Sequence, residues 1–173
     1  IPNGDELIIF TYGSDIQDIV QPVIMMDLNK NEIATIISNL NTALVYTCTY
    51  YALQDIFINR LNAYNGVTKV HLYTDGKNNC PNKTVTGPDA MSAFLGFKKE
   101  SDFLYVNTLG FKADTVFKNN SNVIIQTHPK GEVEDPPAAQ ATTLKPRFIQ
   151  FAFAEGKLNR KHGGFKGALH NLP

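Results

Sequence analysis

The sequence has no tryptophan, only two cysteines and no excess of charge of either sign. Its 16 lysines and arginines balance 16 aspartates and glutamates, so the formal net charge is zero at pH 7. A neutral molecule sets up no long-range field that would recruit nucleic acid or anionic lipid to its whole surface. Any contact with a polyanion must therefore come from a local cluster of cations.

Long apolar runs are also missing. The longest, such as the run from Val23 to Met26, are far shorter than the roughly 20 residues that a membrane-spanning helix requires. We therefore expect no membrane span. The 173 residues, 43% of them hydrophobic, are enough for one ordinary domain with a real core.

Sequence motifs of catalysis and cofactor binding are absent. There is no P-loop, no GxGxxG, no GxSxG and no HExxH. The histidines are scattered, so none has the spacing of a metal-ligand set. We interpret His71, in the middle of a β-prone run, as a core or sheet-face histidine, because no serine, cysteine or carboxylate stands at the spacing of a catalytic triad. The sequence therefore predicts no enzyme, no cofactor and no metal site.

What is present is an alternation of short apolar runs and turn signals, which predicts one α+β domain over residues 1–154. We expect β structure to dominate, mostly as antiparallel sheet, with one amphipathic and one short helix. The amphipathic helix is predicted from Asn31 to Leu44, with a capping box of Asn29 and Glu32. The short helix is predicted from Ala90 to Leu95. The predicted strands are residues 7–12, 23–28, 67–73, 103–106, 111–117, 123–127 and 147–153.

Residues 45–64 support two interpretations. Their apolar side chains fit one face of a helix, whereas their β-branched and aromatic content favours strands. Asn65-Gly66 is typical of a type I′ hairpin turn and leads into the β-prone run from Val67 to Tyr73. We therefore prefer a hairpin to a helix in this segment.

Two later segments have no apolar periodicity. We interpret residues 130–146, rich in proline and alanine, as an exposed connection. Residues 155–173 form a basic, glycine-rich C-terminal arm, which is either a solvated tail or a segment that orders on a partner. Its candidate partner-binding residues are Lys157, Arg160, Lys161, Phe165, Lys166 and Leu169.

Cys48 and Cys80 have no CxxC spacing and no adjacent histidines, so no metal or redox motif is indicated. We expect two buried free thiols rather than a disulfide. Two glycosylation sequons are present, Asn82-Lys83-Thr84 and Asn119-Asn120-Ser121. About two are expected by chance at this content of asparagine, serine and threonine, so the sequons are weak evidence for secretion.

The run Tyr73-Thr74-Asp75-Gly76 resembles the first-strand motif of the ribonuclease H family, in which an aspartate at the end of a strand helps to bind catalytic magnesium. The resemblance implies a metal-dependent nuclease centred on Asp75. Such a site needs several carboxylates around the cation, and the next acidic residues stand in no recognisable pattern. Asp-Gly is also a common hairpin turn, so a nuclease is only the third alternative.

A second resemblance involves the segment from Asp89 to Phe97. The order of a helix, a turn, a strand and this segment resembles a module in structural proteins of double-stranded DNA viruses and virus-like transposons. In that module a short helix ends in a Leu-Gly-Phe box, here Leu95, Gly96 and Phe97. We expect Leu95 and Phe97 to be buried and Gly96 to end the helix in a left-handed conformation.

The viral resemblance implies a minor capsid or other virion component that binds other structural proteins or copies of itself. We therefore predict a non-enzymatic assembly protein located in the virion, with nucleic acid contacted only through the C-terminal arm. The alternative is a secreted, extracellular glycoprotein or ligand-binding domain. It is suggested by the two sequons, the even number of cysteines and a first residue that is Ile1 rather than Met.

Overall fold

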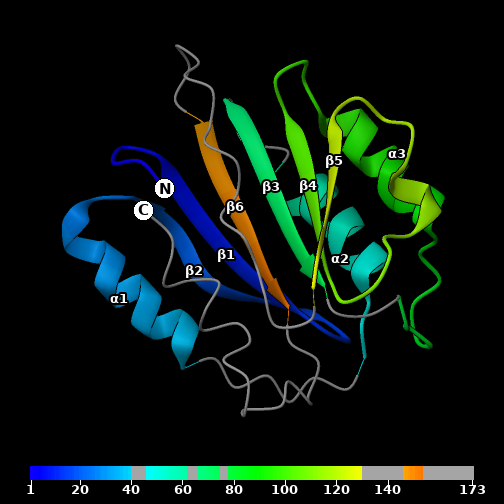
Figure 1. The fold of residues 1–173 in the computed structure, drawn as a ribbon, viewed down its shortest axis with the longest axis horizontal. Helices are drawn as coiled ribbons and strands as arrows, with labels where there is room; N and C mark the ends of the chain where they lie inside the picture. The colour runs from blue at the N-terminus through cyan, green and yellow to red at the C-terminus, as the bar shows by residue number, and fades with distance from the viewer. Residues whose placement is uncertain (40–45, 62–65, 75–77, 130–145, 154–173) are drawn as a thin grey trace.

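The computed structural model describes residues 1–39, 46–61, 66–74, 78–129 and 146–153. Their strands form one six-stranded sheet in the order β2-β1-β6-β3-β4-β5 (Figure 1). The elements in chain order are β1 (Glu6–Tyr12), β2 (Ile16–Ile24), α1 (Asp27–Ser38), α2 (Thr49–Asp55), the π-helix η1 (Ile56–Arg60), β3 (Val67–Thr74), α3 (Gly87–Phe97), β4 (Phe103–Leu109), the 3-10 helix η2 (Thr115–Phe117), β5 (Val123–His128) and β6 (Pro146–Phe153).

The sheet is mostly parallel. Only β1 and β2 pair antiparallel, whereas β1 with β6, β6 with β3, β3 with β4 and β4 with β5 are parallel. The chain therefore has the α+β composition that we expected, but the predicted antiparallel arrangement and the dominance of β structure were wrong. Parallel neighbours need long crossover connections, and α3 lies within the connection from β3 to β4. β3 is buried along its whole length, as is usual for a central strand of a parallel sheet.

Helices cover both faces of the sheet (Figure 1). Along β1, alternate side chains point to opposite faces, so Leu7 and Ile9 join the apolar cluster under α1 while Ile8 and Phe10 join the cluster on the other face. This second, larger cluster contains buried residues of α2, η1 and α3. Within the described ranges, no helix is long and apolar enough to cross a membrane.

The amphipathic helix begins earlier than its sequence pattern indicates. α1 starts at Asp27 rather than Asn31, because the Asn29 side chain accepts a hydrogen bond from the Met26 N–H (3.0 Å) inside the first turn. The Asn29 amide also donates to the Ile24 carbonyl oxygen (2.9 Å). Asn29 therefore lies within the helix and fixes its start, instead of preceding it as the cap of a box with Glu32. Residues 40–44 of the predicted helix lie outside the described ranges.

The preferred hairpin in residues 45–64 was wrong, and the helical alternative was right for residues 49–60, which form α2 and η1. The buried face of these helices decides the outcome, because burial overrides the β propensity of single residues. The predicted strand over residues 111–117 was also wrong, because the only regular structure there is the 3-10 helix η2. Strand predictions for β1, β3, β4, β5 and β6 are confirmed within a few residues.

Two further boundaries differ from the predictions. The second strand is β2, which ends at Ile24, so most of the predicted strand 23–28 belongs to a turn and to α1. The short helix is longer than expected, since α3 begins at Gly87. It is capped by Thr86, whose hydroxyl accepts from the Asp89 N–H (3.3 Å) while the Asp89 carboxylate accepts from the Thr86 N–H (2.8 Å).

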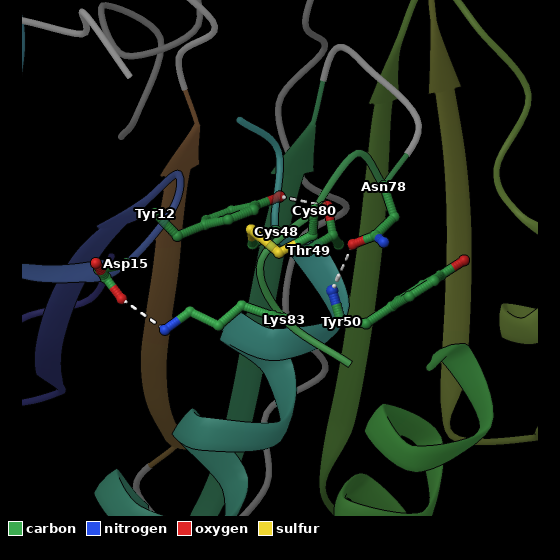
Figure 2. Close-up of a disulfide and its surroundings, with 8 residues drawn as sticks. All are labelled: Tyr12, Asp15, Cys48, Thr49, Tyr50, Asn78, Cys80 and Lys83. Atoms are coloured by element: carbon green, nitrogen blue, oxygen red, sulfur yellow. Dashed lines mark hydrogen bonds and ion pairs between the residues drawn. A yellow bond between two sulfur atoms is a disulfide. The ribbon is translucent and has the colours of Figure 1, made fainter. Parts of the chain in front are cut away.

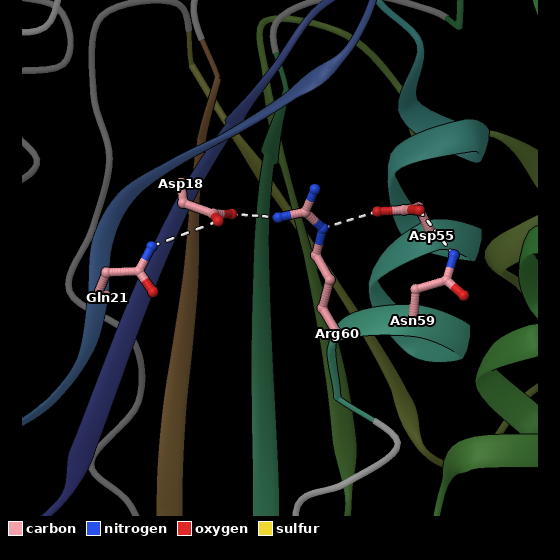
Figure 3. A network of polar contacts seen from close by, with 5 residues as sticks. All are labelled: Asp18, Gln21, Asp55, Asn59 and Arg60. Carbon is pink, nitrogen blue, oxygen red and sulfur yellow. Dashed lines mark hydrogen bonds and ion pairs between the residues drawn. The ribbon is translucent and has the colours of Figure 1, made fainter.

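An ion-pair network connects β2 to η1 (Figure 3). The Arg60 guanidinium donates through Nε to Asp55 Oδ2 (2.7 Å) and through Nη1 to Asp18. Asn59 Nδ2 donates to the other oxygen of Asp55 (2.8 Å). The guanidinium carbon also lies 5.3 Å from the centroid of the Phe10 ring. Arg60 therefore anchors the end of η1 over the β1-β2 hairpin.

Candidate ligand-binding cleft

A cleft of about 350 Å³ lies where the parallel strands β3 and β4 end. The cleft is lined by Thr74 at the end of β3 and by Thr108 at the end of β4. The start of α2 and the segment 111–118 form its walls. Val106 and Phe117 give it an apolar floor. The volume is at the lower end of the range of small-molecule pockets.

A disulfide between Cys48 and Cys80 fixes one wall of the cleft (Figure 2). Thr47 and Asn79 exchange two backbone hydrogen bonds (3.0 and 2.9 Å), which brings the neighbouring cysteines to a Cα–Cα distance of 4.7 Å. This distance lies within the usual range for a disulfide. The expectation of two free thiols was therefore wrong, because the sequence spacing gave no sign of the short β-bridge.

Tyr50 and Asp114 meet across the wall. The Tyr50 hydroxyl donates to Asp114 Oδ2, and the Tyr50 N–H donates to Asn78 Oδ1 (3.1 Å; Figure 2). Burial, together with the hydrogen bond to Asp114, raises the pKa of Tyr50 above its ordinary value. The same hydrogen bond lowers the pKa of Asp114. The pair is therefore a neutral phenol donating to a carboxylate at neutral pH.

The turn after β4 is also held in place. The Thr108 hydroxyl donates to the Phe111 carbonyl oxygen (2.8 Å) and lies 3.2 Å from Thr127 Oγ1 on β5. Gly110 has a φ of 80°, and its N–H donates to the His128 carbonyl oxygen (2.9 Å). Since L side chains rarely adopt this conformation, glycine is favoured over other residues at this turn. These bonds fix the start of the segment 111–118.

Gly87, the first residue of α3, packs closely against Tyr50 and Val116 in the walls of the cleft. A Cβ atom at Gly87 would lie 3.0 Å from Val116 Cγ2 and 3.2 Å from Tyr50 Cζ. The backbone of α3 can therefore approach Tyr50 and η2 closely only because position 87 has no side chain. The ring of Tyr50 also packs against Phe117, with centroids 6.3 Å apart.

Two exposed lysines, Lys112 and Lys118, stand among the lining residues of the cleft. Neither forms an ion pair within the part of the chain that the structure describes. The Asp114 carboxylate between them already accepts hydrogen bonds from Tyr50 and from the Val116 N–H (3.4 Å). The cleft therefore combines an apolar floor with cations at its rim.

The described histidines of the sheet do not contribute to the cleft. His71 on β3 is buried and stacks on Tyr105 of β4, with ring centroids 4.5 Å apart, which confirms its interpretation as a buried sheet histidine. Burial, and secondarily the charge of Lys69, lower the pKa of His71 to about 4. His128 Nε2 lies 3.2 Å from Asn107 Oδ1. In the described ranges, no group of His, Cys, Asp or Glu could hold a metal ion.

The residues of the Leu-Gly-Phe box are placed differently from the prediction. Leu95 is 48% exposed rather than buried. Gly96 lies inside α3 without a positive φ, so it does not end the helix in a left-handed conformation. Phe97 is half-buried and packs on the core, with its ring centroid 5.4 Å from that of Phe57. The box is a turn of an ordinary amphipathic helix, in which one residue faces the core and another faces solvent.

Several candidate residues lie outside the described ranges. They include Asp75, the connection up to residue 145 and the whole arm with its candidate residues Lys157, Arg160, Lys161, Phe165, Lys166 and Leu169.

The residues of the cleft were not recognised from the sequence. The sequence pattern predicts a strand over residues 111–117, whereas Asp114 before Thr115 is the helix N-cap signal in this segment. No protein family, curated protein or solved structure matches this chain.

Proposed function

We propose that this chain is a ligand-binding domain, and that the cleft at the ends of β3 and β4 binds a small organic anion with an apolar body. The observation that carries the proposal is the position of the cleft, with an apolar floor at the carboxyl ends of parallel strands and two rim lysines that form no ion pair with any described residue. In open sheets with parallel strands and covering helices, ligands usually bind at this edge. Backbone turns converge there, so polar groups can be placed precisely over an apolar floor.

The rim and the floor favour different parts of one ligand. The half-buried Phe111 and Ala113, with the deeply buried Val106 and Phe117 as the floor, offer apolar contact, which suits a ring or a short alkyl chain. Lys112 and Lys118 are exposed cations that can pair with a carboxylate at the mouth of the cleft. Since the Asp114 carboxylate already accepts hydrogen bonds from Tyr50, Thr115 and Val116, it opposes such an anion less than a free carboxylate would.

The disulfide indicates in which kind of cellular compartment the domain is found. Disulfides persist in oxidising environments and are rare where thioredoxin and glutathione keep thiols reduced. The Cys48–Cys80 bond therefore supports an extracellular location for the domain. It also supports a preformed site, because the bond restrains the wall that carries Tyr50 and Asn78.

Titration calorimetry with benzoate and with its neutral counterpart benzamide tests the ligand class. We expect benzoate to bind, and benzamide to bind at least about tenfold more weakly, which corresponds to about 1.4 kcal/mol. The double variant Lys112→Gln/Lys118→Gln should abolish this preference. Lys99→Gln, an exposed lysine that does not line the cleft, is the matched control and should preserve it. A preference unaffected by the double variant, or no binding of either probe, would overturn the proposal.

A second candidate function, a virion assembly protein, is favoured by the exposure of Leu95. Ile58 on the adjoining η1 is equally exposed, at 48%, so apolar side chains of two contacting helices face solvent. Sedimentation velocity over a range of concentrations tests this candidate. Leu95→Asp should reduce self-association, whereas Ala34→Asp, at an exposed position of α1 on the other face of the sheet, should leave it unchanged. A wild-type protein that stays monomeric throughout would exclude self-assembly through this surface.

A further inference from the structure

Asn82 lies in a tight turn beside the disulfide. The Lys83 N–H donates to the Cys80 carbonyl oxygen (3.5 Å), so residues 80–83 form a four-residue turn with Pro81 in its second position. Asn82 and the third residue of its sequon, Thr84, are both exposed. The side-chain amide and the hydroxyl that define a glycosylation sequon are thus both accessible at this turn.

Asn119 lies in the turn between η2 and β5. It is exposed and has a φ of 64°, a conformation that asparagine tolerates better than most residues. Ser121, the third residue of this sequon, is exposed as well. β5 begins only at Val123, so the sequon ends before the strand starts.

The two sequons could have fallen elsewhere in this fold. Asn107 and Asn122, for example, are buried and engaged in hydrogen bonds, so a glycan could not be accommodated there. Both sequons therefore lie in exposed turns of a chain that also carries a disulfide. Exposed loops are where N-glycans are accommodated without disturbing the packed core.

We infer that Asn82 and Asn119 are N-glycosylation sites, modified when the chain passes through a compartment that forms its disulfide. The donor is a lipid-pyrophosphate-linked oligosaccharide. The side-chain amide nitrogen of asparagine bonds to the anomeric carbon of the first sugar, the bond from that carbon to the pyrophosphate oxygen breaks, and the amide loses one proton to the transferring enzyme or to water. No oxidant or reductant takes part.

The glycan on Asn119 has a consequence for the cleft. Asn119 directly follows Lys118, which lines the cleft, so the glycan stands at the rim. A bulky hydrated chain at that position obstructs a macromolecular surface but leaves room for a small molecule. This consequence rests on the proposed function, whereas the modification itself does not.

The experiment uses the full chain secreted from a eukaryotic host. Intact mass is measured before and after digestion with peptide-N-glycosidase F in heavy-oxygen water, followed by peptide mapping. We expect a glycan at each site, removed by digestion, with the label on the aspartate that replaces each asparagine. Asn82→Gln and Asn119→Gln should each remove one glycan. The controls Lys83→Gln and Asn120→Gln change the middle residue of each sequon, preserve the sequon and should keep the glycan.

Unmodified asparagine at both positions, in secreted protein and in the cell lysate, with the disulfide intact, would overturn the inference. A glycan at only one position would overturn it for the other. Benzoate binding is measured separately on protein digested with the glycosidase. A failure of glycosylation and a failure of the ligand proposal are therefore distinguishable.

Discussion

Replacing Cys48 and Cys80 together with alanine should lower the free energy of unfolding by about 4 kcal/mol. The disulfide joins residues that are 32 positions apart. In the chain-entropy description, a closed loop of this length restricts the unfolded chain by an amount worth about 3.7 kcal/mol at 25 °C. Cys48 is only 2% exposed, so its truncation also removes a small amount of core packing.

Urea denaturation followed by circular dichroism measures this loss directly, and thermal unfolding offers a second measurement. For a chain of this size, a loss of about 4 kcal/mol corresponds to a fall in Tm of roughly 8 to 16 °C. Because Asn78 and Tyr50 belong to the wall that the bond restrains, benzoate binding should weaken in the same variant.

The wild-type protein under reducing conditions is the matched control. It should lose a similar free energy of unfolding, whereas the double alanine variant should be insensitive to the reductant. A double variant within about 1 kcal/mol of the oxidised wild type would refute the reasoning. In that case the backbone bridge between Thr47 and Asn79 would hold the segment without help from the disulfide.

Three further predictions follow from buried or strained positions. Burial holds the pKa of His71 at about 4, below its value of about 6.5 in the unfolded chain, so the unfolded state binds more protons between pH 4 and pH 6.5. The free energy of unfolding of the wild type should therefore fall by roughly 3 kcal/mol as the pH drops through this range. His71→Phe should flatten this dependence in urea titrations at several pH values, and an unchanged slope would contradict it. Gly110→Ala should cost about 1–2 kcal/mol in thermal unfolding because of its φ of 80°, and a neutral effect would mean that the turn relaxes. Leu95→Ala removes a half-exposed side chain and should lower the free energy of unfolding, measured in urea, by less than about 1 kcal/mol. Phe94→Ala removes a side chain that is 1% exposed and should lower it by about 3–5 kcal/mol. Similar losses in the two variants would show that the faces of α3 are misassigned.

The local elements of this fold could be predicted where sequence and burial agree. β1 is a short apolar run and β3 a run of β-prone residues that follows a turn, and both strands form close to where the pattern indicates. The start of α1 was misplaced because Asn29 has two roles that a pattern does not separate. It can cap a helix from outside or, as here, reach back to the Met26 N–H from inside the first turn.

The arrangement of the strands could not be predicted in the same way. A strand sequence carries little information about which neighbour it will pair with, and alternation along β4 fits an antiparallel as well as a parallel partner. The preference for a hairpin before β3 then led to an antiparallel sheet. The helices α2 and η1 could not be distinguished from strands by residue type, because packing on α3 decides their conformation.

The cleft was missed for a related reason. It is assembled from separate stretches of the chain: the start of α2, the ends of β3 and β4, and the segment 111–118, which contributes most of the lining side chains. Apart from Tyr73-Thr74-Asp75-Gly76, which resembles a nuclease motif, these segments contain no recognisable motif. The pairing of Tyr50 with Asp114, 64 positions apart, becomes visible only once the turn after β4 is folded.

The position of β6 determines when this sheet can be completed during synthesis. β6 lies between β1 and β3, pairing Phe148 with both Leu7 and Lys69. At usual rates of translation, β1 leaves the ribosome on the order of ten seconds before its neighbour exists. During that interval β1 and β3 each carry an unpaired edge, which is the kind of surface that pairs with other chains. The sheet can therefore be completed only after residues 146–153 have been made, because they join its two halves.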